Sequence, residues 1–211
     1  MSAILQDISE KLQKGKMKEV AELVKQAVAD GIQPLTILNE GLMPGMDIIG
    51  ERFKKNDIFI PEVLIAARAM AAGTDVLRPL LVGDQMEEKG TVVIGTIKDD
   101  LHDIGKNLVR MMMESKGLNV IDLGNSVPPA KYIEAAAKHN ADIIACSALL
   151  TTTMAVMGEV VEQAKAAGIR DKVKIMVGGA PVTAQFCRSI GADAYTSDAA
   201  TAANVAADFF S

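Results

Sequence analysis

After residue 90, short apolar runs rich in β-branched residues alternate with longer amphipathic segments, and this alternation constrains the possible folds most strongly. Strands are predicted at 91–97, 119–123, 142–147, 174–177 and 194–196, and helices at 108–116, 128–139, 154–167, 182–190 and 201–210. An α/β fold with five parallel strands and helices on both faces follows from this order. The right-handed crossover rule favours a doubly wound, flavodoxin-like (Rossmann-type) sheet with strand order 2-1-3-4-5.

The preceding part of the chain shows the helical period alone. Apolar residues recur at helical spacing near 4–12, 20–28, 35–49 and 61–77. Pro44 lies inside the third segment and should kink it or remove one backbone hydrogen bond. Four short-looped helices form a bundle. We therefore expect a four-helix domain at 1–85, a polar linker at 82–90 and the α/β domain at 90–211.

Charge and apolar patterning argue against several classes of partner. The chain has 22 basic and 27 acidic residues, a net charge of −5 and no basic run, which disfavours nucleic-acid binding. No apolar run approaches the ~18 residues of a membrane span, and the amphipathic start lacks the apolar block of a signal peptide. Cys146 and Cys187 lie far apart, which disfavours a disulfide framework or a CxxC zinc site. A cytoplasmic protein is expected.

The residues suited to ligand chemistry follow the first, third and fourth predicted strands. The first of these loops reads KDDLHDIG at 98–105, the second reads SALLTTT at 147–153, and the fourth strand ends at Gly178-Gly179. Ligands of such sheets bind outside the carboxyl ends of the strands, at the crevice where the strand order reverses. With this strand order the crevice lies between the first and third strands, so we expect the first two loops to meet there.

Two interpretations of the first loop are open from its residues alone. Asp100 can accept a hydrogen bond from one ring nitrogen of His102, which would leave the other nitrogen free to bind a metal. Alternatively, Asp100 or Asp103 caps the helix that begins near Gly105, and His102 is a solvent-facing loop residue.

Several common sites are excluded by particular positions. A P-loop needs a glycine five residues before Gly105, where this chain has Asp100, and no GxGxxG follows the first strand. A receiver domain needs a phospho-accepting aspartate at the end of the third strand, where this chain has Cys146-Ser147. Ser147 also lacks the flanking glycines of a nucleophile elbow.

Three separated motifs, in this order, resemble the signature of cobalamin-binding domains. They are Asp100-x-His102-x-x-Gly105, Ser147-x-Leu149 and Gly178-Gly179. The segments GTIKDDLHDIGKNLV and GGAPVT are especially similar to the corrinoid proteins of microbial methyltransferase systems. Asp99 departs from the family pattern, because the family usually has glycine at that position.

The helical part resembles the cap of methionine synthase and of corrinoid methyl carriers, through GERF at 50–53 and IFIPEV at 58–63. The resemblance thus covers essentially the whole chain. Cobalamin-dependent mutases share the histidine loop but lack this cap, so their resemblance to the chain is less complete.

The resemblance also implies roles for individual residues. His102 is the expected axial ligand of the cobalt of a cobalamin bound base-off/His-on, and Asp100 and Thr153 extend from it as a relay. This relay is expected to couple protonation to the redox state of the cobalt. The other cofactor-binding residues that the resemblance implies are Asp103, Ile104, Gly105, Ser147, Leu149, Thr151, Gly178 and Gly179, with Phe53, Ile60 and Val63 in the cap.

Within that set, the resemblance gives each kind of residue a different purpose. The glycines are expected to leave room for the nucleotide tail of the cofactor, and Ser147 to hydrogen-bond its base. The apolar cap residues are expected to shield the upper face of the corrin from water, and the cap must then move away during methyl transfer.

The function that the resemblance implies is a methyl carrier, a non-catalytic component of a methyltransferase system. Cob(I)alamin would accept a methyl group from a substrate:corrinoid methyltransferase, and methylcob(III)alamin would donate it to a second methyltransferase with a tetrahydrofolate or thiol acceptor. A reductive activase is a further expected partner. Methanol, a methylamine, a betaine or an aromatic methyl ether remains open as the methyl donor. An adenosylcobalamin mutase subunit, a cobalamin-responsive sensor or regulator, and a flavodoxin-like protein for another ligand are the alternatives.

Overall fold

The computed structural model describes residues 2–81 and 89–210. The chain divides into two compact units, Met1–Glu87 and Glu88–Ser211. Most of the predicted linker at 82–90 lies outside the described residues. None of the described helices has the length and apolar character needed to cross a lipid bilayer.

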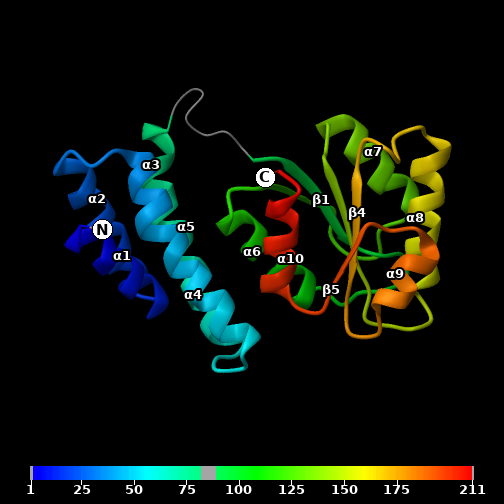
Figure 1. Cartoon of the computed structure of the whole chain (residues 1–211), viewed down its shortest axis with the longest axis horizontal. Helices are drawn as coiled ribbons and strands as arrows, with labels where there is room; N and C mark the ends of the chain where they lie inside the picture. The colour runs from blue at the N-terminus through cyan, green and yellow to red at the C-terminus, as the bar shows by residue number, and fades with distance from the viewer. Residues whose placement is uncertain (1, 82–88, 211) are drawn as a thin grey trace. The chain divides into compact units, whose positions relative to one another are not determined.

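The first unit is helical, as predicted (Figure 1). Its elements are α1 (Ala3–Gln13), α2 (Met17–Ala29), α3 (Pro34–Thr36), η1 (Ile37–Leu42), α4 (Met43–Lys54), α5 (Ile60–Leu77) and η2 (Arg78–Leu80). The α3, η1 and α4 segments follow one another without a break and form the third predicted helix. The η1 segment is π-helical, and the Met43 N–H donates to the Leu38 carbonyl, five residues back. Because Pro44 has no N–H to donate, the disruption predicted there takes the form of this wider turn.

The second unit is the predicted doubly wound sheet. Its elements are β1 (Thr91–Thr96), α6 (Ile104–Ser115), β2 (Asn119–Asp122), α7 (Pro129–His139), β3 (Ile143–Ser147), α8 (Ala155–Ala166), β4 (Lys174–Gly178), α9 (Ala184–Ile190), β5 (Ala194–Thr196) and α10 (Ala199–Asp208). The strands are parallel in the order β2-β1-β3-β4-β5, which confirms the predicted topology. The helix after β1 begins at Ile104, near Gly105 and ahead of the apolar run at 108–116, because Gly105, Lys106 and Asn107 interrupt the apolar period that locates a helix in the sequence.

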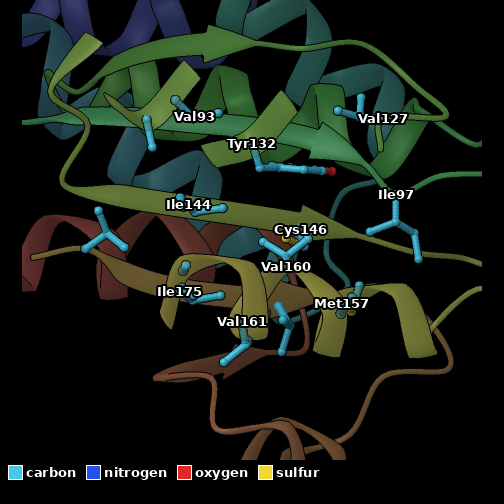
Figure 2. Packing of buried hydrophobic residues seen from close by; sticks show 14 of the residues in the cluster. Val93, Ile97, Val127, Tyr132, Ile144, Cys146, Met157, Val160, Val161 and Ile175 are labelled. Atoms are coloured by element: carbon cyan, nitrogen blue, oxygen red, sulfur yellow. The ribbon is translucent and has the colours of Figure 1, made fainter. Parts of the chain in front are cut away.

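One face of the sheet packs its strand residues against α7 and α8 (Figure 2). Tyr132 of α7 is completely buried there, and a Cβ atom at Gly95 of β1 would lie 2.7 Å from its hydroxyl oxygen. Glycine at position 95 therefore makes room for the tyrosine. Since side chains alternate along a strand, Thr96 and its neighbours in the adjacent strands point to the other face, on which α6 and α10 pack together (Figure 1).

Candidate functional site

Asp100 and His102, in the loop after β1, form a hydrogen-bonded pair. The Asp100 side chain is completely buried, and its Oδ1 lies 2.8 Å from Nδ1 of His102 and accepts the His102 backbone N–H at 3.0 Å. An ionised carboxylate only accepts hydrogen bonds, so Nδ1 bears the hydrogen. About half of the His102 side chain is exposed. A neutral His102 therefore has its lone pair on Nε2, the nitrogen that a metal can bind.

The second oxygen of Asp100 joins this pair to the loop after β3. Asp100 Oδ2 accepts the backbone N–H groups of Leu149 at 2.7 Å and Leu150 at 3.1 Å, and the Thr153 hydroxyl at 3.3 Å. Burial alone would raise the pKa of Asp100, but the donors from Leu149, His102 and Leu150 outweigh it and hold this pKa well below its usual range. The structure therefore brings Asp100, His102 and Thr153 together.

The buried carboxylate of Asp100 should make the apo protein sensitive to acid. A carboxyl group whose pKa is lower in the folded state than the ~3.9 of an unfolded chain stabilises the fold above that value, and this contribution is lost as the pH falls. Asp100 should thus contribute about 1 kcal/mol less to the free energy of unfolding at pH 3 than at pH 6. Urea denaturation at both pH values would measure the difference. An equal acid loss in Asp100→Asn would contradict the assignment.

The alternative in which an aspartate caps the next helix is wrong. Asp103 occupies the N-cap position of α6, but its side chain makes no capping hydrogen bond. Both carboxylate oxygens of Asp100 are engaged by His102 and the loop after β3. The Asp103 carbonyl accepts the Asn107 N–H, which is the first hydrogen bond within the helix.

A third loop, between β2 and α7, holds the histidine loop in place. Asp99 has a φ of 66° and donates its N–H to the Ser126 hydroxyl at 3.1 Å. Ser126 has a φ of 49° and donates its own N–H to the Asp100 carbonyl at 2.9 Å. Glycine adopts a left-handed conformation without strain, so Asp99 stands at a position whose backbone favours glycine. No motif in the sequence pointed to Ser126.

The three glycines expected at the cofactor differ in why each is a glycine. A Cβ atom at Gly105 would meet nothing within 4 Å, and one at Gly178 would make only ordinary contacts. Gly179 has a φ of 126°, and a Cβ atom there would lie 1.8 Å from the Ala148 carbonyl oxygen. The fold itself therefore requires Gly179. It does not require Gly105 or Gly178, and both leave space that a ligand can fill.

A row of hydroxyl groups crosses the sheet beside Gly178. Thr96, Ser147, Gly178 and Thr196 are neighbours in register on β1, β3, β4 and β5. The Thr96 hydroxyl donates to the His102 carbonyl at 2.9 Å, so this row is connected to the histidine loop. Sequence reasoning identified Ser147 and Gly178 but missed Thr96 and Thr196, because register relates residues that are distant in the chain.

The two loops that meet at Asp100 carry exposed apolar side chains. Within the described part of the second unit, the exposed large apolar side chains belong to four residues, which are Leu101, Ile104, Leu149 and Leu150. Thr151 is also exposed, whereas Asp103 and Ser147 are partly buried. Exposed apolar groups gathered at one place indicate a binding surface.

The predicted cap residues differ in exposure. Ile60 is exposed, Phe53 is partly buried and Val63 is completely buried. Phe59 is 68% exposed, and its backbone N–H donates to the Glu62 carboxylate at the start of α5. The contact of Val63 with a corrin stays a prediction, and it would require this side chain to become accessible.

The donor set fits a cobalamin better than a bare metal ion. Within the described residues, no group of three or more His, Cys, Asp or Glu side chains is arranged to hold a metal ion. His102 offers one imidazole nitrogen, which suffices for a cobalt whose four equatorial ligands come from a corrin ring. The exposed leucine and isoleucine side chains would contact such a ring, and Gly105 and Gly178 would leave room for the nucleotide tail.

Comparison with known proteins points to the same ligand. Two family models, each described as a B12 binding domain, match residues 90–206 and 4–78. Over 177 residues the chain is 47% identical to trimethylamine corrinoid protein 1 of Methanosarcina acetivorans, covering 83% of this chain and 82% of that protein. Over 200 residues it is 41% identical to the dimethylamine corrinoid protein of Methanosarcina barkeri, covering 94% and 93%.

A solved structure extends the similarity to three dimensions. The methanol:cobalamin methyltransferase complex MtaBC from Methanosarcina barkeri contains a chain that superposes with a TM-score of 0.87 at 30% identity. The match covers 98% of this chain and 79% of that one.

Proposed function

Since this chain belongs to the B12-binding corrinoid proteins, a family of methyl carriers, we propose that it holds its cobalamin base-off with His102 as the axial cobalt ligand. The observation that most supports this proposal is the geometry of Asp100, which binds Nδ1 of the half-exposed His102 and so leaves the lone pair on Nε2. When bound, cobalamin supplies the cobalt that accepts and donates the methyl group. The residues of the chain would hold the cofactor, and Asp100 would set the orientation of His102 and which of its ring nitrogens bears the hydrogen.

A methylamine is the methyl donor that the relatives favour. Two relatives at 47% and 41% identity are named trimethylamine and dimethylamine corrinoid proteins. A carrier of this kind would receive the methyl group from a methylamine:corrinoid methyltransferase. It would pass the group to a second methyltransferase that uses a thiol or tetrahydrofolate, and a reductive activase would restore the active cobalt. The relatives' names favour a carrier over a mutase subunit or a regulator.

Asp100 and Thr153 would control the proton of His102. Asp100 lies 2.8 Å from Nδ1 and would stabilise a positive charge on the imidazole ring when no metal is held at Nε2. The Thr153 hydroxyl faces the other oxygen of the same carboxylate and the Leu150 carbonyl at 3.0 Å. These contacts support the prediction that protonation is coupled to axial ligation.

The helical unit would shield the upper face of the corrin. Ile60, at the start of α5, is an exposed apolar residue, and this supports the prediction that it protects the methyl group from water. Phe53 is partly buried, and the resemblance alone gives it the same role. Both methyl transfers need that face open to a partner, so this unit would have to move during turnover.

The test of this proposal is to label the histidine and observe the cobalt. Protein grown with ¹⁵N-histidine and loaded with cob(II)alamin should show a two-line nitrogen splitting in its electron paramagnetic resonance spectrum, because ¹⁵N has spin one half. Cobalt bound by its own benzimidazole would instead keep a three-line splitting.

The chain has two histidines, which provides a matched control. His102→Ala should abolish the ¹⁵N splitting and weaken cobalamin binding by at least about tenfold. His139 is an exposed residue at the end of α7, so His139→Ala should change neither the splitting nor the affinity for cobalamin. A two-line splitting that persists in His102→Ala would refute the ligand assignment.

A further inference from the structure

Lys106 lies one residue after Gly105 and forms a buried ion pair with Asp122, the last residue of β2. The Lys106 side chain is 2% exposed, and its Nζ donates to both oxygens of Asp122, at 2.6 and 2.7 Å. A third hydrogen bond, to Oδ1 of Asn107 at 2.8 Å, satisfies the last ammonium proton. Arg110 Nη1 lies 3.4 Å from the same carboxylate.

The position of this lysine is electrostatically unfavourable for a helix. Lys106 is in the first turn of α6, where the helix dipole favours negative rather than positive charge. Removing an ammonium group from water costs several kcal/mol, and apolar residues of similar volume are often at least as stabilising as a buried ion pair. Stability alone is therefore a poor explanation for a lysine at this position.

The Asp122 carboxylate is ionised and well held. Burial alone would raise its pKa, but the hydrogen bonds from Lys106 and from the Gly124 N–H bring the pKa below its ordinary value. The Gly124 N–H donates to Oδ1 of Asp122 at 2.9 Å. The ion pair therefore fixes the chain just beyond β2 as well as the first turn of α6.

A continuous set of hydrogen bonds leads from this pair to His102. The Gly124 carbonyl, two residues after Asp122, accepts the Thr96 N–H at 3.0 Å. The Thr96 hydroxyl in turn donates to the His102 carbonyl at 2.9 Å. From the other side, Lys106 is only four residues after His102 along the chain. Both ends of the histidine loop are thus connected to the same ion pair.

We propose that the Lys106–Asp122 ion pair is a positioning device that holds the His102 loop in its metal-binding geometry. This inference rests on the proposed function, because it assumes that His102 binds the cobalt. Neither residue touches the metal in this scheme. They act by fixing the two backbone segments from which His102 is oriented, and their loss should lower the fraction of cobalt that is bound by histidine.

The alternative is that the pair contributes only to stability, and a second ion pair offers the matched control. Arg170 binds Asp193 at 3.0 Å, with both side chains about four-fifths buried. Arg170 also donates to the Gly191 carbonyl, and Asp193 accepts the Ile175 N–H near the start of β4. This pair lies at the amino ends of the strands, whereas the His102 loop lies at their carboxyl ends.

The experiment compares Lys106→Met with Arg170→Met in ¹⁵N-histidine protein. Both variants should unfold at lower urea concentration than the parent. Only Lys106→Met should show a reduced two-line splitting with cob(II)alamin and a cobalamin dissociation constant raised about tenfold or more, as is typical for residues that orient a metal ligand. Lys106→Arg keeps the positive charge, so it should recover part of the splitting and part of the affinity that Lys106→Met loses.

A normal splitting and a normal dissociation constant in Lys106→Met would overturn the inference. If Lys106→Met does not fold, Asp122→Asn serves in its place, since asparagine keeps an acceptor for the Gly124 N–H. An unchanged splitting in Asp122→Asn would overturn the inference equally. An equal loss in Arg170→Met would also overturn it, because the effect would then follow stability. Absence of the two-line splitting in the parent protein would instead refute the proposed function.

Discussion

Gly179→Ala is expected to destabilise the α/β unit by more than about 3 kcal/mol, whereas Gly105→Ala should leave the unit folded and weaken cobalamin binding. The Cβ atom added at Gly179 would lie 1.8 Å from the Ala148 carbonyl oxygen, in a backbone conformation with a φ of 126°. The backbone at Gly179 or at Ala148 must therefore move. Ala148 precedes Leu149, whose N–H binds Asp100, so the movement would also displace a donor of the histidine pair.

At Gly105 the same methyl group meets nothing within 4 Å, and alanine in a helical turn is more favourable than glycine by up to about 1 kcal/mol. Gly105→Ala should therefore unfold at equal or higher urea concentration than the parent. Its affinity for cobalamin should fall by about tenfold or more, if the nucleotide tail passes this position. Urea denaturation of both apo proteins and titration of Gly105→Ala with hydroxocobalamin measure the two effects. A stable Gly179→Ala, or full affinity in Gly105→Ala, would contradict the explanation given for these glycines.

Asp100→Ala should reduce both the stability of the apo protein and its affinity for cobalamin. The substitution leaves the backbone N–H groups of His102, Leu149 and Leu150, whose hydrogen bonds are partly buried, without the acceptor that Asp100 provides. Unsatisfied buried donors cost about 1–3 kcal/mol each, so the total loss should exceed about 3 kcal/mol. Without its orienting partner, His102 should bind cobalt about 10- to 100-fold more weakly.

Asp100→Asn should not rescue these losses, although asparagine has almost the same shape as aspartate. Donors approach both oxygens of the carboxylate, so either orientation of an amide directs its NH₂ group at N–H donors. Thr153→Val is the milder control, because it removes only the 3.3 Å hydrogen bond to Asp100 and the bond to the Leu150 carbonyl. We expect it to cost about 1 kcal/mol. Denaturation and cobalamin titration of the three variants provide the measurement, and parental values in Asp100→Asn would contradict the argument.

Much of the site was predictable because its motif is short in the sequence. Asp100 and His102 are two residues apart at the end of a strand, and their pairing at 2.8 Å follows from a local loop. Thr153 came only through the family resemblance, since nothing local relates it to a residue 53 positions earlier. The β2–α7 loop escaped prediction because Ser126 acts through one hydroxyl and one N–H, which leave no pattern in the sequence.

By itself the sequence predicted the two-part organisation, the strand order and the two loops that meet at Asp100. It could do so because hydrophobic periodicity is a local property, and because parallel strands with right-handed crossovers allow few topologies. The tertiary structure alone decided that Gly179 is required by the fold and Gly105 is not, and that Lys106 is buried against Asp122. Such distinctions depend on which atoms from distant segments come within a few ångströms, and strand register and helix packing set those distances only once the chain has folded.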